Sequence, residues 1–95
     1  MIEQKNVLIN MDAETYKHSR KFQDILIGKT IRFVRYLTEA EAEAMGWHSR
    51  PLVIYFEDGG FIIPQSDDEG NDGGALYMRH SDDGKDADDE LIYTL

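Results

Sequence analysis

The stretch Leu52-Val53-Ile54-Tyr55-Phe56-Glu57-Asp58-Gly59-Gly60-Phe61-Ile62-Ile63 decides the fold. Two runs rich in β-branched and aromatic residues, 52–56 and 61–63, flank four residues that suit a tight turn. Asp-Gly or Gly-Gly between such runs is a strong signal for a β-hairpin. We therefore predict two antiparallel strands joined by a turn at residues 57–60.

A helix signal and a strand signal precede this hairpin. Residues 38–41 (Thr-Glu-Ala-Glu) form a capping box, in which Thr38 caps the helix and Glu41 reaches back to the cap. The helix continues through an Ala-rich segment, and Gly46 ends it in a left-handed conformation. Before it, residues 31–37 alternate with β-branched and aromatic content, which is typical of a strand.

Weaker signals extend the fold in both directions. We predict a first strand at residues 7–9, a helix at 13–26 capped by Asp12, and further strands at 75–78 and 91–95. The chain is thus expected to be a single α+β domain over residues 1–95. It should contain a mostly antiparallel, small twisted or barrel-like sheet of four to six strands with one or two helices. Residues 81–90 are predicted to be a mobile acidic loop.

Charge is distributed unevenly along the chain. The 95 residues include 19 acids against 10 lysines and arginines. Ten of these acids fall within residues 67–90, where only Arg79 and Lys85 oppose them. A field of this kind attracts cations, a basic partner or the chain's own basic face. That basic face is predicted within residues 17–35, where only Asp24 opposes Lys17, Arg20, Lys21, Lys29, Arg32 and Arg35.

Composition argues against several classes of function. The absence of cysteine removes disulfides, thiolate nucleophiles and sulfur-ligated zinc, and fits a cytoplasmic protein. The formal charge of −9 disfavours direct binding to nucleic acid, since phosphate contacts need clustered lysine and arginine. There is neither an apolar run long enough for a membrane span nor a basic-then-apolar leader, so no membrane association or secretion is expected.

The first candidate site is the Gly-rich loop at residues 67–74. Its carboxylates, on Asp67, Asp68, Glu69 and Asp72, are ligands of the type that Ca²⁺ prefers. However, the spacing lacks the glycine and the closing glutamate of the EF-hand calcium loop. The same composition is typical of a polar turn in which Asp and Asn side chains cap their own backbone.

The second candidate site is the acidic run Asp82, Asp83, Asp86, Asp88, Asp89 and Glu90. One interpretation is a solvated loop that shields a sheet edge. The other is mimicry of nucleic-acid phosphates, in which the carboxylates occupy a basic cleft of a partner.

Trp47, the only tryptophan, is followed closely by Arg50. An exposed tryptophan beside an arginine is a typical anchor for a protein partner. Packing of the Trp47 ring over the sheet is the alternative, since a small domain needs its large aromatic residues for the core.

Catalytic patterns are weak throughout. His80, Ser81 and Asp82 are adjacent, whereas the members of a catalytic triad converge from distant positions. The three histidines lack zinc-site spacing, and Gly28-Lys29-Thr30 lacks the upstream glycine of a phosphate-binding loop. We therefore predict a protein that is not an enzyme and needs no cofactor.

Several runs of the sequence form a recognisable pattern: Ile27-Gly28-Lys29-Thr30-Ile31, Val34-Arg35-Tyr36-Leu37-Thr38, Met45-Gly46-Trp47, Arg50-Pro51-Leu52, Asp58-Gly59 and Asp67-Asp68-Glu69-Gly70-Asn71-Asp72-Gly73-Gly74-Ala75-Leu76. Over about residues 27–78 the chain resembles a group of short, uncharacterised proteins from bacteriophages and bacteria. The resemblance implies a phage origin and a shared design for the Trp47/Arg50 turn and the 67–74 loop. It brings no catalytic residue.

Our leading hypothesis is a non-enzymatic, phage-encoded binding protein. Its acidic face would engage a basic host protein, such as a nucleic-acid-binding or defence protein, with Trp47 and Arg50 as anchors. One alternative is a cation or small-ligand site in the 67–74 loop. Another is self-association, in which the basic face of one copy meets the acidic face of a second, or the two faces dock within one monomer.

Overall fold

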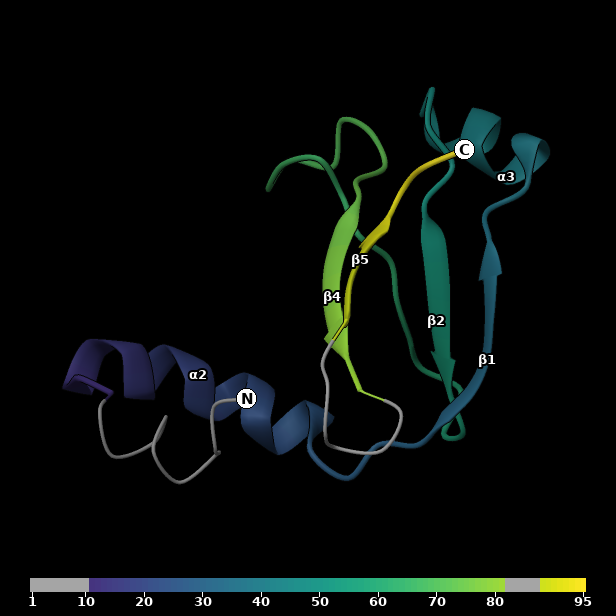
Figure 1. Cartoon of the computed structure of the whole chain (residues 1–95). Helices are drawn as coiled ribbons and strands as arrows, with labels where there is room; N and C mark the ends of the chain where they lie inside the picture. The colour runs from purple at the N-terminus through teal and green to yellow at the C-terminus, as the bar shows by residue number, and fades with distance from the viewer. Residues whose placement is uncertain (1–10, 82–87) are drawn as a thin grey trace.

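The computed structural model describes residues 11–81 and 88–95, which form two helices and five strands (Figure 1). Every strand pair is antiparallel. The predicted α+β class is therefore confirmed. The strands are divided between two small open sheets, however, and the sequence pattern did not indicate this division.

Both helices begin where their capping residues predict. Helix α2 (Ala13–Leu26) follows Asp12, whose Oδ1 accepts a hydrogen bond from the Thr15 backbone N–H at 2.7 Å. Helix α3 (Glu39–Met45) carries the complete capping box and ends at Gly46, which has a φ of 75°. That left-handed φ strains any residue with a Cβ, so glycine suits the position.

The first sheet contains the predicted hairpin. Its strand order is β1 (Ile31–Tyr36), β2 (Leu52–Phe56) and β3 (Phe61–Ile62). The Phe56 N–H donates to the Gly60 carbonyl at 2.8 Å, and this closes the turn between β2 and β3. A β-bulge between Ile31 and Phe33 shifts the register of β1 against β2.

The second sheet is a hairpin of β4 (Leu76–His80) and β5 (Asp88–Ile92). The prediction of an acidic loop through residue 90 is therefore wrong for residues 88–90, which are strand residues. Arg79 on β4 forms an ion pair with Asp89 at 3.7 Å, and His80 Nε2 lies 3.6 Å from Glu90 Oε1. The predicted strand at residues 7–9 lies outside the described residues.

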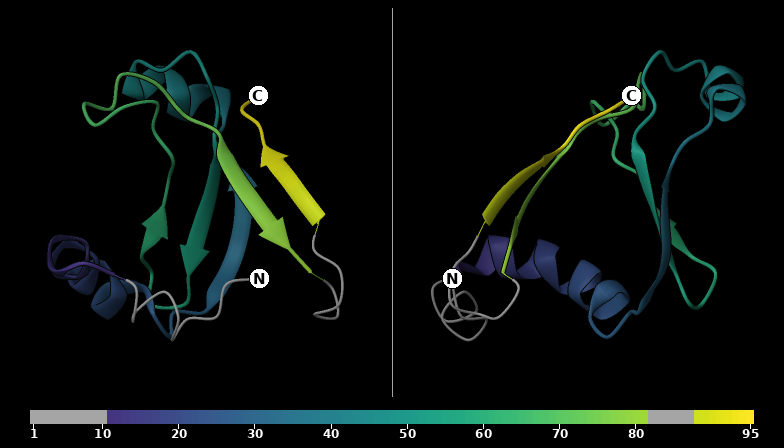
Figure 2. Two further views of the ribbon diagram at one scale, coloured as in Figure 1. Left: turned by 60° about the vertical axis from the view of Figure 1, so that its left-hand side comes forward. Right: turned by 45° about the vertical axis from the view of Figure 1, so that its right-hand side comes forward.

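The core lies beside α3, at one end of the first sheet. Leu37, Ala42, Trp47 and Val53 are buried together, and Tyr55 and Ile63 pack against them. The two sheets converge near the C-terminus, where the Tyr36 and Tyr93 rings stack 6.2 Å apart, and diverge toward the opposite end (Figure 2). Helix α2 lies at that opposite end and has no buried residue.

Candidate protein-interaction surface

Trp47 is a core residue, so its interpretation as an exposed anchor is wrong. Only 6% of the residue is accessible. Its indole Nε1–H donates a hydrogen bond to the Gly70 carbonyl at 2.8 Å, which joins the turn after α3 to the 67–74 loop. The alternative interpretation, packing in a small core, is the one that the structure bears out.

Asp72 makes a second connection between the same turn and loop. Its Oδ1 accepts hydrogen bonds from the backbone N–H groups of Ser49 at 2.9 Å and His48 at 3.1 Å, and also from that of Gly73 at 2.8 Å. These donors, Ser49 above all, lower the pKa of the Asp72 carboxyl. Asp72 therefore faces inward and serves the fold.

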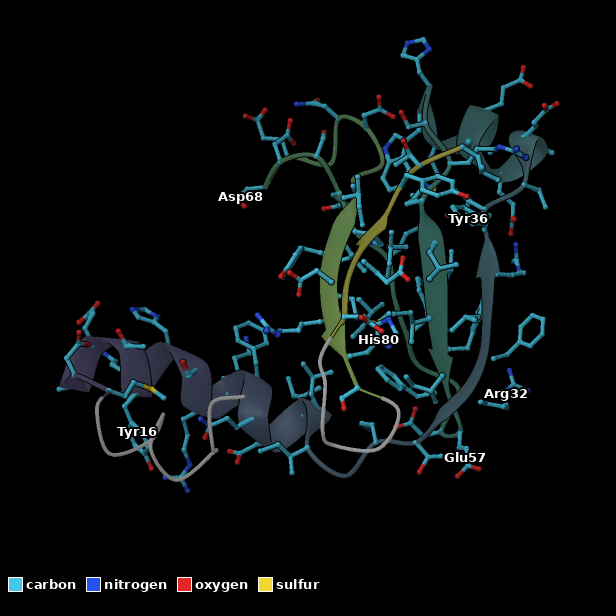
Figure 3. The ribbon with its side chains drawn as sticks, in the orientation of Figure 1. Tyr16, Arg32, Tyr36, Glu57, Asp68 and His80 are labelled. Carbon is cyan, nitrogen blue, oxygen red and sulfur yellow. The ribbon has the colours of Figure 1, made fainter. Side chains whose placement is uncertain are left out.

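The Asp67 carboxylate also accepts hydrogen bonds from within the loop. It accepts hydrogen bonds from the Asn71 side chain and the Glu69 backbone N–H, both at 2.9 Å. The bonds from Asn71 are the main reason that the pKa of Asp67 is lowered. Asp68 and Glu69 are exposed like Asp67, and Asp68 lies at the outer tip of the loop (Figure 3).

The 67–74 loop thus has the architecture of a polar turn with capped Asp and Asn side chains. Across the described ranges, 11–81 and 88–95, no group of three or more potential metal-ligating side chains is close enough to hold a metal ion. The carboxylates of Asp67 and Asp72 already accept backbone donors. A cation at either carboxylate would compete with donors that hold the loop.

Arg50 is fixed mainly through its backbone. Its N–H and carbonyl pair with the carbonyl and N–H of Leu95, at 3.1 and 2.9 Å. This pairing joins Leu95 to the segment that leads into β2. The half-buried Arg50 lines a groove of about 540 Å³ together with Glu39, Glu43 and His48.

The β4–β5 hairpin displays the remaining acids that the structure describes in the second candidate site. Asp88, Asp89 and Glu90 follow one another on β5, and all three are exposed. Asp82, Asp83 and Asp86 lie outside the described residues. Because successive side chains of a strand point to opposite faces, Asp88 and Glu90 share one face and Asp89 lies on the other. The acids therefore do not form a single flat array.

Three of the six cations of the predicted basic face pair with nearby acids. The ion pairs are Arg20 with Asp24, Lys29 with Asp58, and Arg35 with Glu41. The Arg35 guanidinium donates two hydrogen bonds to the Glu41 carboxylate, of 2.8 and 2.9 Å, and lowers the pKa of Glu41 to about 2. Among the described residues, none of these cations pairs with an acid of residues 67–90, so docking of the two faces within one monomer is not observed.

One feature of the hairpin was missed by sequence reasoning. Tyr77 and Leu91 are opposite each other across β4 and β5, and they are 67% and 62% exposed. They share a face with Arg79 and Asp89, and a hydrogen bond to Asp89 raises the pKa of the Tyr77 phenol. The predicted strands at residues 75–78 and 91–95 include Tyr77 and Leu91, but the sequence does not indicate that the two strands pair in this register.

The chain matches no protein-family model, no curated protein and no solved structure. Within residues 11–81 and 88–95, no helix is long and apolar enough to cross a membrane.

Proposed function

We propose that this chain is a non-enzymatic binding protein that engages a basic partner protein through the acidic β4–β5 hairpin. The observation that carries the proposal is the run Asp88-Asp89-Glu90 on an exposed strand. Two further exposed acids, Asp68 and Glu69, precede the same hairpin in the chain. Carboxylates on a strand keep a fixed spacing, which a mobile loop would not provide.

Two properties of the β5 acids support this assignment: they are exposed, and the basic residues of β4 balance their charge only weakly. Asp89 and Glu90 keep 55% and 56% of their side chains accessible while paired with Arg79 and His80. Ion pairs with this much exposure contribute little to stability, so a partner's lysine or arginine can compete for them. Tyr77 and Leu91 add apolar surface beside these charges. An apolar centre with a charged rim is common in protein interfaces.

The proposed setting is the cytoplasm of a phage-infected host. The resemblance to phage proteins supports this origin, and the negative charge suits a host protein whose own site is basic because it binds nucleic acid. The hairpin would then compete with nucleic acid for that site. Association should be fast and salt-sensitive, because charges on exposed surfaces are screened beyond about 8 Å at physiological ionic strength.

A pull-down with matched variants tests this proposal. The tagged chain is exposed to bacterial lysate, washed at low and at moderate salt, and the captured proteins are identified by mass spectrometry. The test variant carries Asp88→Asn, Asp89→Asn and Glu90→Gln. The control variant carries Glu39→Gln, Glu43→Gln and Glu57→Gln, which removes the same charge from exposed positions elsewhere.

We expect an identified nucleic-acid-binding protein that is retained by the parent and the control, lost by the test variant and displaced by added DNA or RNA. Equal capture by both variants would remove the hairpin as the binding site. Capture that persists through moderate salt would contradict a mechanism based on the acids.

A further inference from the structure

Within residues 11–81 and 88–95, the outer edge of β5 is open to strand pairing. Among the described residues, β5 pairs with β4 alone, so its other edge has no strand partner there. A sheet of two strands is marginally stable, and a third strand adds backbone hydrogen bonds and side-chain packing. Exposed edges of this type serve in other proteins as templates for an extended segment of a partner.

The placement of the acids favours a partner that lies in the plane of the hairpin. Asp88 and Glu90 point to one face and are about 7 Å apart along the strand, whereas Asp89 points to the other face. A partner docked on either face would reach only part of this charge. A strand added beside β5 alternates its own side chains in the same way, so it can oppose all three acids.

Charge selects which strand can be added. Pairing of β5 with the β5 of a second copy brings like charges together, which destabilises a sheet: Glu90 faces Glu90 in the symmetric antiparallel register, and all three acids face their own copies in a parallel one. We propose that the β5 edge accepts a basic, extended segment of a partner protein as a third strand of the β4–β5 sheet. The inference rests on the proposed function and names the partner's chemistry at the same site.

The sequence of β5 also indicates the pattern of that segment. Basic side chains would lie opposite residues 88–90, and apolar side chains would lie opposite Leu91 and Ile92. The exposed Leu91 would then lie between Tyr77 of β4 and an apolar residue of the added strand. In an antiparallel arrangement, the segment has two apolar residues followed by three basic residues.

Synthetic peptides test strand addition directly on the full-length chain. The probe is the acetylated peptide Thr-Val-Val-Lys-Arg-Lys-Thr, together with two isomers that are N-methylated on alternate residues. A β-strand directs alternate N–H groups to opposite edges, so one isomer keeps the donors that face β5 and the other loses them. Calorimetry should give affinities for the two isomers that differ by about tenfold or more, because two or three backbone hydrogen bonds are at stake.

Amide hydrogen exchange locates the binding site. The unmethylated peptide should slow exchange in β5 (residues 88–92) and leave α3 (residues 39–45) unchanged. Glu90→Lys should abolish binding, while the control Glu43→Lys, on an exposed position of α3, should leave the affinity unchanged.

The remaining outcomes separate this inference from the proposed function. Equal affinities of the two methylated isomers would show attraction by charge alone and would overturn strand addition. Failure of all three peptides would also overturn it, and the pull-down would decide independently whether the acidic hairpin binds a partner. If a peptide of residues 29–37 binds instead, and Arg32→Glu converts an oligomer of the chain to monomer in light scattering, the occupant is β1 of a second copy. That result would overturn the assignment to another protein.

Discussion

At the scale of single residues, Asp72 illustrates how a candidate ligand can be a structural group. Three backbone N–H groups donate to its Oδ1, and two of them belong to the turn after α3. We expect Asp72→Ala to lower the melting temperature clearly, because three backbone donors, two of them in part-buried bonds, lose their acceptor. Asp68→Ala, four residues earlier on the exposed loop, should leave it unchanged. Thermal unfolding followed by Trp47 fluorescence measures both, and equal melting temperatures would contradict the assigned role.

Glu41 gives a prediction for the pH dependence of stability. Its pKa falls from 4.5 to about 2 in the folded chain, mainly because Arg35 donates to it and also because it caps α3. A lowered pKa means that the folded state favours the ionised carboxylate, so this stabilisation is present above pH 4.5 and is lost as the pH falls toward 2. Glu41→Gln should therefore flatten the decline of melting temperature between pH 4.5 and 2. An unchanged slope would show that Glu41 titrates normally.

At the scale of elements, α3 depends on residues that a local pattern identifies. Thr38 accepts from the Glu41 N–H at 3.2 Å, and Gly46 occupies the left-handed region. Thr38→Ala should lower the free energy of unfolding by about 1 kcal/mol, since the first turn loses its cap. Gly46→Ala should lower it by a similar ~1 kcal/mol, since alanine is strained at positive φ. Chemical denaturation measures both values, and Ala44→Ser on the exposed side of α3 is the control.

The elements that could be predicted are those whose signals are close in sequence. The capping box of α3 and the Asp58-Gly59 turn of the first hairpin each lie within a few residues, and the structure confirms both. Strand β5 could be predicted only in its apolar half: Leu91 and Ile92 fall in the predicted strand at 91–95, whereas the acids Asp88, Asp89 and Glu90 have low strand propensity. Their conformation depends on pairing with β4, across an intervening segment. The burial of Trp47 likewise depends on Gly70, which is 23 residues away.

At the scale of the whole molecule, acids without a cationic partner remain on the exposed surface, and this supports a binding role. Three of the six cations of residues 17–35 pair with Asp24, Asp58 and Glu41, whereas Asp88 and Asp68 have no cationic partner among the described residues. The chain is also extended. Its radius of gyration is 15.6 Å, against about 12 Å for a compact domain of this length. The hairpin and α2 therefore present surface that the core does not cover.

The position of α2 implies that it folds independently of the core. None of its residues is buried, and it makes few contacts with the other described elements. Lys21→Pro lies in the helix interior, where proline costs about 3 kcal/mol of helix stability. We expect it to reduce the helical circular dichroism while changing the core unfolding free energy, reported by Trp47 fluorescence, by less than about 0.5 kcal/mol. Ala42→Pro in the buried turn of α3 is the matched comparison and should lower both signals, because Ala42 packs in the core. If Lys21→Pro also lowered the core unfolding free energy reported by Trp47 fluorescence, α2 and the core would unfold as one unit.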